Sequence, residues 1–503
     1  MFGSVDSCVL AGLEVRLVRV EADIGRGNDH RFFLVGLAAT TVKEARERVR
    51  SAIRNSGLEY PTTRLTVNLA PAELRKEGTG LDLPIAISIV LARAHRPAPP
   101  RSAFLGELAL DGSVRHVDGV LVAARGLREL GFERIFVPAE DAAEASLADG
   151  LEVIPCESLI AVVNHLLESG VIAAASPRSG TIALDSPLEH DLVEVHGQEE
   201  AKRALEVAAA GGHHLLLSGP PGAGKTMLAR CLPGILPPLE LGEALEVAQV
   251  RSILSDLPRD RPLDWARPFR APHHGISAAG LIGGGSGVAM PGEISRANHG
   301  VLFLDELAEF QTPVLQALRQ PIETGRITLT RSGGSVTYPT RFTLVAATNP
   351  CPCGWSGDVV RVCRCTPGAV DTYHRRLSGP LLDRIDLLVT VRRVPLEALA
   401  SEPRGEHSAA VRERVVAARG RQLGRQDCLN GQLKPARLRQ VAALAPGSRR
   451  TLERWSANRG MTARGFHRAW RVARTAADLD GSLEIDEHHV LEALGFRLQD
   501  VAA

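Results

Sequence analysis

A glycine-rich turn between an apolar run and a helical pattern limits this chain more than any other feature. Residues 215–226 read LLLSGPPGAGKT, a buried strand followed by the pattern G-x-x-x-x-G-K-T. The glycines let the backbone turn tightly, so that its N–H groups and the next helix N-terminus meet phosphate oxygens. We expect Lys225 to bind the β- and γ-phosphates of ATP or GTP and the Thr226 hydroxyl to bind Mg²⁺. The predicted nucleotide-binding residues are Gly219, Pro220, Pro221, Gly222, Ala223, Gly224, Lys225, Thr226 and Met227.

Two further apolar runs end in polar side chains that suit a bound nucleoside triphosphate. Residues 301–306 read VLFLDE, and residues 343–350 read TLVAATNP. We expect Asp305 to hold the magnesium shell, Glu306 to polarise the attacking water and Asn349 to orient it. The pattern predicts a parallel sheet with its chemistry at the carboxyl ends of the strands. Taken alone, the acidic pair is also typical of a surface turn, and so is an Asn before Pro.

The length of the chain and its apolar patterns predict several domains. At 503 residues the chain is too long for one hydrophobic core. Residues 1–170 alternate strand-like and helix-like patterns and predict an α+β domain, and residues 171–187 are small and turn-rich, as in a linker. Residues 188–395 hold the phosphate motifs, and residues 396–503 have mostly helical periodicity. The predicted fold class is a multidomain α/β protein.

The apolar runs and the first residues predict a cytoplasmic protein that has no membrane partner. No run approaches the roughly 18 apolar residues that span a bilayer. The first residues, MFGSVDSCVL, lack the basic region and apolar core of a secretory signal.

The net charge of +1 hides a basic segment near the carboxyl end. From Arg392 to Thr475 there are 18 Arg and one Lys against six Asp and Glu. Such a segment in a neutral protein favours a polyanionic partner, most often a nucleic acid. Arginines on helix surfaces or at a nucleotide are the alternative interpretation.

Half of the eight cysteines lie within one short segment. The four are Cys351, Cys353, Cys363 and Cys365. Four thiolates on one loop suit a tetrahedral structural Zn²⁺, which would stiffen that loop beside the predicted nucleotide site. Free or redox-active thiols and a disulfide are the alternatives, because C-x-C is tighter than the usual C-x₂-C spacing.

The order of these motifs resembles that of AAA+ ATPases. Residues 195–205, VHGQEEAKRAL, resemble the AAA+ segment that packs beside adenine, which favours ATP and makes His196 a binding residue. Residues 377–387, LSGPLLDRIDL, resemble the segment that carries the arginine finger. The resemblance implies that Arg384 reaches a neighbouring subunit's site, so that the active unit is a ring. An ion pair of Arg384 with Asp383 or Asp386 within one chain is the alternative.

A second arginine is expected from the lid. Residues 460–468, GMTARGFHR, resemble the sensor 2 helix of AAA+ proteins. The resemblance implies that Arg464 contacts the γ-phosphate within its own subunit. Arg468, one turn later, is the competing residue.

Three motifs resemble one AAA+ group in particular. Residues 269–274 (FRAPHH), residues 291–306 (PGEISRANHGVLFLDE) and residues 378–386 (SGPLLDRID) resemble the magnesium-chelatase-like group, and the whole chain resembles its ComM family, also called YifB. The resemblance implies a front domain like Lon protease and ribosomal protein S5, an AAA+ core and a helical magnesium-chelatase-type lid. It also implies a hexameric ring that uses Mg²⁺ and ATP as a helicase, driving DNA branch migration in recombination after natural transformation.

A Lon-type front domain raises the possibility of a protease. Residues 76–84, KEGTGLDLP, resemble the segment around the Lon nucleophile, but Gly80 stands at the place of the serine. Residues 106–121 resemble the segment that carries the lysine, but Leu121 stands at its place. Without nucleophile or base there is no route to an acyl-enzyme, so we expect an inactive scaffold.

A hairpin is the expected DNA contact. Residues 326–344 predict two strands that turn at Gly333 and Gly334, and in related ring motors a hairpin at this place points into the pore. Arg331 near its tip is the predicted backbone contact, with a solvated surface arginine as the alternative. The long insertion at residues 239–298 contains His273 and His274, but an adjacent pair is a weak metal signal, and we assign it no chemistry.

Two other functions compete with a DNA motor. One is a chelatase-type motor that remodels a protein partner. The other is a scaffold without enzymatic activity, against which the full set of ATP-site residues argues.

Overall fold

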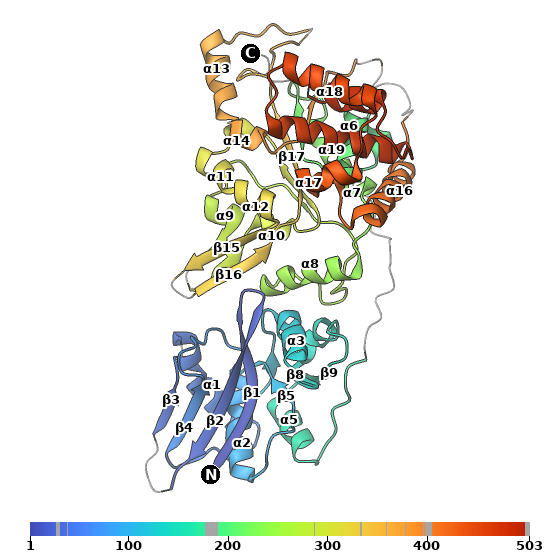
Figure 1. Ribbon diagram of the computed structural model, residues 1–503. Helices are drawn as coiled ribbons and strands as arrows, with labels where there is room; N and C mark the ends of the chain where they lie inside the picture. Colours follow the sequence, from blue (N-terminus) through green and yellow to red (C-terminus); the bar gives the residue numbers. More distant parts are fainter. Residues whose placement is uncertain are drawn as a thin grey trace.

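The computed structural model places an N-terminal unit against a central unit, which carries the C-terminal helices (Figure 1). It describes residues 1–26, 31–37, 39–176, 190–285, 287–331, 334–358, 360–377, 379–395, 397 and 405–497. Most of the predicted linker, residues 177–187, and most of residues 396–404 therefore lie outside the described residues. The domain boundaries proposed from the sequence stay predictions.

The N-terminal unit is built on a mixed seven-stranded sheet. In β2, Val18, Val20 and Ala22 are fully buried, whereas Arg19 and Asp23 are exposed, which is the period of two that a sheet with one covered face requires. Parallel and antiparallel pairs both occur. Its strands, in spatial order, are β3 (Phe32–Val35), β4 (Leu65–Ala70), β2 (Glu14–Ile24), β1 (Phe2–Ala11), β5 (Ser102–Phe104), β8 (Arg134–Pro138) and β9 (Glu152–Cys156).

Helices and a short hairpin accompany this sheet. The apolar run at residues 83–92 lies in α2, which is buried on nearly every side because it packs on β1, β2, α1 and α5. The elements are α1 (Thr40–Asn55), α2 (Asp82–Ala94), α3 (Val120–Glu129), α4 (Ala142–Ala145) and α5 (Leu159–Leu166), with β6 (Glu107–Leu108) and β7 (Val114–Arg115).

The central unit has an all-parallel sheet of five strands, as the motifs predicted. Its strands are short and mostly apolar, which suits a sheet covered on both faces. The pairs Leu304↔Ala346 and Ser218↔Thr348 bring the carboxyl ends of three strands to one edge. In spatial order the strands are β11 (Phe269–Arg270), β14 (Val301–Leu304), β17 (Thr343–Thr348), β10 (Leu215–Ser218) and β18 (Leu387–Thr390).

Helices and two small hairpins surround the central sheet. Leu329 of one hairpin lies against Gly283 of the other, and Tyr338 donates a hydrogen bond to the carbonyl oxygen of Ala289 at 2.7 Å. The hairpins are β12 (Gly283–Gly284) with β13 (Met290–Pro291), and β15 (Arg326–Arg331) with β16 (Gly334–Pro339). The helices are α6 (Glu199–Gly211), α7 (Lys225–Ile235), α8 (Leu241–Ile253), α9 (Ala278–Ile282), α10 (Glu293–Arg296), α11 (Thr312–Ala317), α12 (Arg319–Thr324), α13 (Pro367–Arg376) and α14 (Gly379–Leu382).

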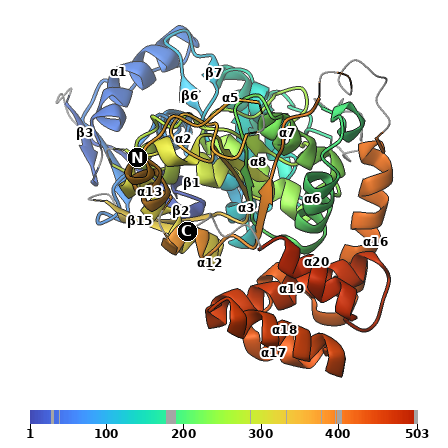
Figure 2. The ribbon, with the colours of Figure 1, turned by 90° about the horizontal axis from the view of Figure 1, so that it is seen from above.

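The C-terminal unit is helical and packs beside α6 and α7 (Figure 2). The long amphipathic helix α19 buries Ala469, Val472, Ala473 and Ala477 in the same core as the central sheet. Its helices are α16 (Ser408–Gln426), α17 (Pro435–Val441), α18 (Pro446–Asn458), α19 (Ala463–Leu479) and α20 (Glu487–Gly495).

Helix α8 joins the N-terminal and central units. Leu121 of α3 is fully buried in one apolar cluster with Val247 and Ala248 of α8. The carboxylate of Glu144 accepts hydrogen bonds from the Leu121 backbone N–H at 2.8 Å and from the Ser252 hydroxyl at 2.5 Å. The contact between the two units therefore combines the burial of apolar side chains with a carboxylate whose hydrogen-bonding needs are met.

Candidate nucleotide-binding site

The predicted phosphate loop joins β10 to α7. Gly222 and Gly224 have φ angles of +77° and +92°, the left-handed region that glycine adopts without steric cost. The Lys225 ammonium is buried and donates hydrogen bonds to the carbonyl oxygens of Gly219 at 2.6 Å and Pro220 at 3.0 Å. Burial lowers the pKa of Lys225, and the carboxylates of Asp305 and Glu306 offset part of this shift.

Side chains from three strand ends meet at this loop. Thr226 donates a hydrogen bond to a carboxylate oxygen of Asp305 at 2.9 Å. Lys225 donates one to the Asn349 side-chain oxygen at 3.1 Å. An ammonium, a hydroxyl, a carboxylate and an amide at one helix N-terminus fit a nucleoside triphosphate with Mg²⁺, because they supply phosphate donors and hard oxygen ligands together.

Glu306 follows the same strand end but points elsewhere. Its backbone has a φ of +51°, and its N–H donates to Asp305 at 2.9 Å. Its carboxylate is about half exposed and lies 3.3 Å from Nδ1 of His274. His274 stacks on His273, with ring centroids 4.0 Å apart.

Sequence reasoning missed His274. It follows β11, the strand beside β14, so the parallel order brings it to the carboxyl end where Glu306 lies. The motif FRAPHH could have indicated this contact, because its first two residues form β11, the strand next to β14. Among the described residues, the two histidines belong to no group of three or more converging metal ligands.

The segment before α6 reaches the same region. His196 is partly buried. Two residues later, Gln198 takes a left-handed backbone with φ of +61°, and its amide donates to the carbonyl oxygens of Arg392 at 2.5 Å and Ala223 at 3.5 Å. These bonds tie the segment of His196 to the phosphate loop.

In the structure, Arg384 forms an ion pair with a glutamate that was not considered from the sequence. Arg384 contacts Glu323 of α12 at 2.5 Å, and its side chain is 15% exposed. Asp386 contacts His213 at 3.4 Å. Burial raises the pKa of Asp386, but the hydrogen bond to His213 and the nearby charges of His213, Arg471 and His214 together outweigh burial and hold this pKa well below its usual range. Asp383 contacts Arg468.

The two lid arginines differ in exposure. Arg468 is 3% exposed, and its guanidinium donates to the carbonyl oxygens of Leu382 at 3.4 Å, Ile385 at 3.3 Å and Asp383. Arg464 lies in the first turn of α19 and is exposed. Arg468 therefore holds the Arg384 segment in place. The contact of Arg464 with the γ-phosphate stays a prediction.

The four predicted cysteines come together beside the phosphate loop. Their sulfur atoms all lie within 4.8 Å of one another, and Cys351 Sγ is 3.4 Å from Cys353 Sγ and 3.6 Å from Cys363 Sγ. None of them forms a disulfide. Four converging thiols fit tetrahedral Zn²⁺. Gly354 of the same loop has a φ of +82° and packs so closely on Pro221 that a Cβ there would meet the proline ring at 2.6 Å.

The hairpin predicted to contact DNA is present, and Arg331 at the end of β15 is exposed. Its turn residues 332–333 lie outside the described residues, and Gly334 begins β16. The pairing Arg331↔Gly334 closes the hairpin. The structure therefore places Arg331 at a tip of the central unit.

The basic C-terminal segment divides into inward and outward arginines. Several bond inside the fold: Arg412 to the Gly234 carbonyl oxygen at 2.8 Å, Arg419 to that of Ala209 at 2.9 Å, and Arg425 to the buried Asp478 at 2.7 Å. Seven exposed members lie on or beside α17 and α18: Lys434, Arg437, Arg439, Arg449, Arg450, Arg454 and Arg459. Only part of the charge excess is thus free to attract a polyanion.

The places of a Lon nucleophile and lysine have apolar surroundings. A Cβ on Gly80 would lie 3.0 Å from methyl groups of Leu105 and Val117. Leu121 is fully buried beneath α8. Both positions serve packing, which agrees with the expected loss of protease chemistry.

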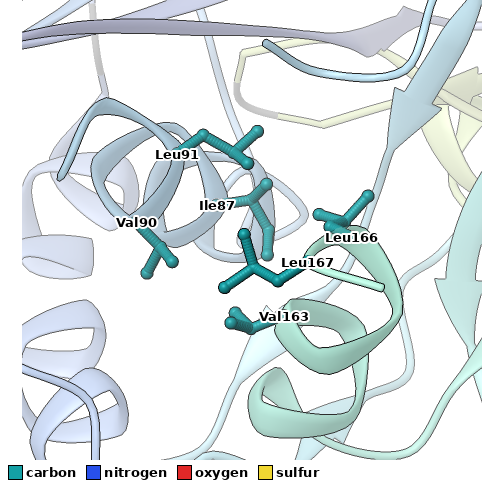
Figure 3. Close-up of a pocket in the computed structure, with 6 residues that line it drawn as sticks. All are labelled: Ile87, Val90, Leu91, Val163, Leu166 and Leu167. Carbon is teal, nitrogen blue, oxygen red and sulfur yellow. The ribbon is translucent and has the colours of Figure 1, made fainter. Parts of the chain in front are cut away.

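An apolar hollow lies between α2 and α5, far from the phosphate loop (Figure 3). It is lined by Ile87, Val90, Leu91, Val163, Leu166 and Leu167. These side chains offer no hydrogen-bonding group to orient a ligand. We assign it to packing.

Comparisons with known proteins identify the family. Models described as magnesium chelatase, subunit ChlI, match residues 191–399 and 20–141, and a model of the ChlI C-terminal region matches residues 405–497. The chain is 44% identical over 494 residues to the uncharacterized protein YifB of Escherichia coli, covering 97% of this chain and 96% of YifB. It is 42% identical to the competence protein ComM of Haemophilus influenzae, covering 97% and 95%. This chain belongs to the ComM/YifB family.

The ComM/YifB family is a magnesium-chelatase-like AAA+ family, as the motifs predicted. A magnesium-chelatase 38 kDa subunit of Cereibacter sphaeroides is 28% identical over 176 residues, which cover 31% of this chain and 51% of that subunit. The mixed α/β architecture, with its parallel sheet and helical C-terminal unit, agrees with AAA+ proteins. Among the described helices, none is both long and apolar enough to cross a bilayer.

Proposed function

We propose that the chain is an ATP-hydrolysing DNA motor that assembles as a ring and acts as a helicase in branch migration. The observation that carries the ATPase part is the convergence of Lys225, Thr226, Asp305 and Asn349 within hydrogen-bonding distance at the P-loop. The family of the chain supports a AAA+ motor with ATP and Mg²⁺ as its ligands.

Each residue has a distinct part in this proposal. Lys225 and the loop N–H groups bind the phosphates, while Thr226 and Asp305 hold Mg²⁺, which offsets phosphate charge when bound. Glu306 accepts a proton from the attacking water once its carboxylate leaves His274 and turns to the site. Asn349 orients that water, and Arg464 binds the γ-phosphate from the lid.

The DNA part of the proposal rests on surface charge and on a relative. Arg331 at an exposed hairpin tip, and the exposed arginines of α17 and α18, suit sequence-independent contacts with phosphates. A 42% identical relative carries the name competence protein ComM. Branch migration during recombination after natural transformation is the role that we infer from this resemblance.

The ring part rests on Arg384. We propose that Arg384 leaves Glu323 in the assembled ring and stabilises negative charge in the neighbouring subunit's site, as an arginine finger does. A hexamer is the ring that the family resemblance favours. We also propose that the four cysteines hold structural Zn²⁺, which fixes the loop after Asn349.

The decisive experiment is ATP-dependent branch migration on a synthetic four-way junction. We expect the parent protein to move the junction. We expect Glu306→Gln to bind ATP but to lose about a hundredfold or more of its turnover, because general-base catalysis contributes that much. ATP hydrolysis without junction movement or any response to DNA would contradict the helicase proposal.

A chelatase-type motor that remodels a protein is the competing function. The similarity to a magnesium-chelatase subunit favours it. DNA separates the two functions: a DNA motor hydrolyses ATP faster when DNA is added, whereas a protein remodeller does not. If DNA leaves the rate unchanged, the search moves to a protein client.

A further inference from the structure

The N-terminal unit separates its charges between two parts of the chain. Residues 26–64 hold eight Arg and Lys against four Asp and Glu, whereas residues 101–170 hold five against twelve. The described part of the basic segment forms β3, α1 and the approach to β4, and β3 is an edge strand of the sheet. The acidic segment forms β5 to α5 at the opposite edge. One edge of the unit is therefore basic and the other acidic.

Arginines of the basic edge are stacked on aromatic rings. The guanidinium of Arg64 lies 4.9 Å from the centre of the Phe33 ring, and that of Arg54 lies 5.8 Å from Tyr60. Two more arginines stack on Phe33 and Phe32 at 5.6 and 5.8 Å. We call this set the arginine–aromatic edge; its residues are Arg31, Phe32, Phe33, Arg46, Arg54, Tyr60 and Arg64.

Stacking on the aromatic rings orients these arginines so that they can bind phosphate groups. A ring that holds one face of a guanidinium leaves the N–H groups at its rim directed outward, and it reduces the rotamer freedom lost when a ligand binds. Arg46, Arg54 and Arg64 are exposed. Arg46 also lies 3.4 Å from Glu47, an exposed pair that contributes little to stability. Planar, exposed, pre-oriented guanidinium groups suit the paired oxygens of a phosphate group, to which arginine can donate two parallel hydrogen bonds.

The edge lies on the same side of the molecule as the hairpin that carries Arg331. Both views show β3 and the β15–β16 hairpin on one side (Figures 1 and 2). The two units touch at the turn between β1 and β2, where Gly12 lies against Val336 and Tyr338 of β16. The pairs Ile24↔Leu65 and Phe32↔Leu65 put the arginine–aromatic edge at the other end of β2 from this turn. A DNA strand that contacts both the hairpin tip and the basic edge would therefore run along the length of β2 on the β3 side of the N-terminal unit.

We propose that the arginine–aromatic edge binds the phosphate backbone of a DNA strand that passes the β15–β16 hairpin. The contact is independent of base sequence, because the guanidinium groups bind phosphates. The aromatic rings are already covered by the arginines and are not offered to the bases. This surface rests on the proposed DNA function. It gives the N-terminal unit a role in binding DNA, whereas no protease activity is expected of this unit.

The test measures binding of a fluorescent oligothymidine strand to the full-length protein over a series of salt concentrations. The variant is Arg46→Ala/Arg54→Ala/Arg64→Ala. Its matched control, Arg101→Ala/Arg128→Ala/Arg134→Ala, removes the same charge from the acidic half of the same unit. We expect the slope of log affinity against log salt to fall by about two in the variant, because each phosphate contact on a single strand contributes about 0.7. The control keeps the parent slope.

A second variant tests the rings. Phe33→Leu keeps apolar bulk but removes the ring face under Arg64, and we expect weaker DNA binding with an unchanged basal ATPase rate.

Subunit assembly is measured by mass photometry for every variant. Parent-like slope and affinity in the triple variant would overturn this surface alone, and so would a loss of assembly with DNA binding per subunit retained. A parent protein that binds no DNA would overturn the motor proposal as well.

Discussion

At the scale of single residues, His299 shows how a side chain outside the chemistry fixes the elements around it. Its ring contacts Glu243 at 3.1 Å and Glu246 at 2.8 Å, both on α8, and Arg267 donates to its carbonyl oxygen at 2.7 Å. Burial lowers the pKa of His299, but hydrogen bonds to the two carboxylates outweigh burial and raise it above the usual value. His299 also contacts the Arg341 carbonyl through its N–H.

We predict that His299→Asn destabilises the protein more at low pH than at high pH. A raised folded-state pKa contributes stability that is complete below the unfolded value of about 6.5 and is lost as the pH rises through the folded value. We expect the variant to lose about 2 kcal/mol near pH 6, the worth of a hydrogen bond to a charged group, and much less near pH 9. Asn also tolerates the φ of +57° at this position.

The measurement compares thermal unfolding midpoints of parent and variant across this pH range. A difference that is equal at both ends would show that the ring acts as a neutral hydrogen-bonding group. A difference that grows with pH would contradict the raised pKa.

At the scale of elements, the cysteine loop after β17 is positioned to influence ATP binding. Gly354 packs on Pro221 of the phosphate loop, and Asn349, just before the loop, accepts a hydrogen bond from Lys225. We predict that Cys353→Ser/Cys363→Ser reduces bound zinc from about one equivalent to near zero, because two of four thiolate ligands are gone. The KM for ATP should rise because the loop no longer supports Pro221.

Metal analysis and ATPase kinetics on the same preparations check this prediction. The matched control is Cys428→Ser, which removes a partly exposed thiol outside the cluster. Parent protein that holds under about half an equivalent of zinc would contradict the structural metal. Loss of zinc with unchanged KM would show that the loop keeps its place without the ion.

At the scale of the whole molecule, the proposed role of Arg384 predicts that one chain alone cannot complete an active site. We predict that Arg384→Ala and Lys225→Ala are each inactive alone and that mixing them restores hydrolysis. In a mixed ring, an intact P-loop from one subunit can meet an intact arginine from its neighbour. Random mixing in equal amounts should give about a quarter of the parent sites, if the arginine acts in trans as a finger.

Glu323→Gln is the control for this prediction. It breaks the contact of Arg384 within the chain and leaves the arginine in place. If Arg384 acts only through Glu323, this variant is as inactive as Arg384→Ala and mixing restores nothing. Full activity of Glu323→Gln together with recovery on mixing would support the ring.

The sequence by itself determined the parts of the site that depend on short stretches of chain. An apolar strand must be followed by Gly222 and Gly224 for the loop to turn, and Lys225 and Thr226 then open the helix by covalent connection alone. Asp305 and Asn349 were predictable in the same way, because parallel strands share one carboxyl edge. The cysteine cluster needed only a loop of 15 residues.

Only the tertiary structure decided which distant groups became partners. The sequence did not show that His274 meets Glu306, that Glu323 pairs with Arg384, or that Arg468 is buried while Arg464 is exposed. Nor did it show that α8 packs on Leu121 and so connects the central unit to the N-terminal unit. These contacts depend on strand order, helix placement and the burial of apolar faces across hundreds of residues. Local patterns carry no information on which charged neighbour will be nearest once those faces are packed.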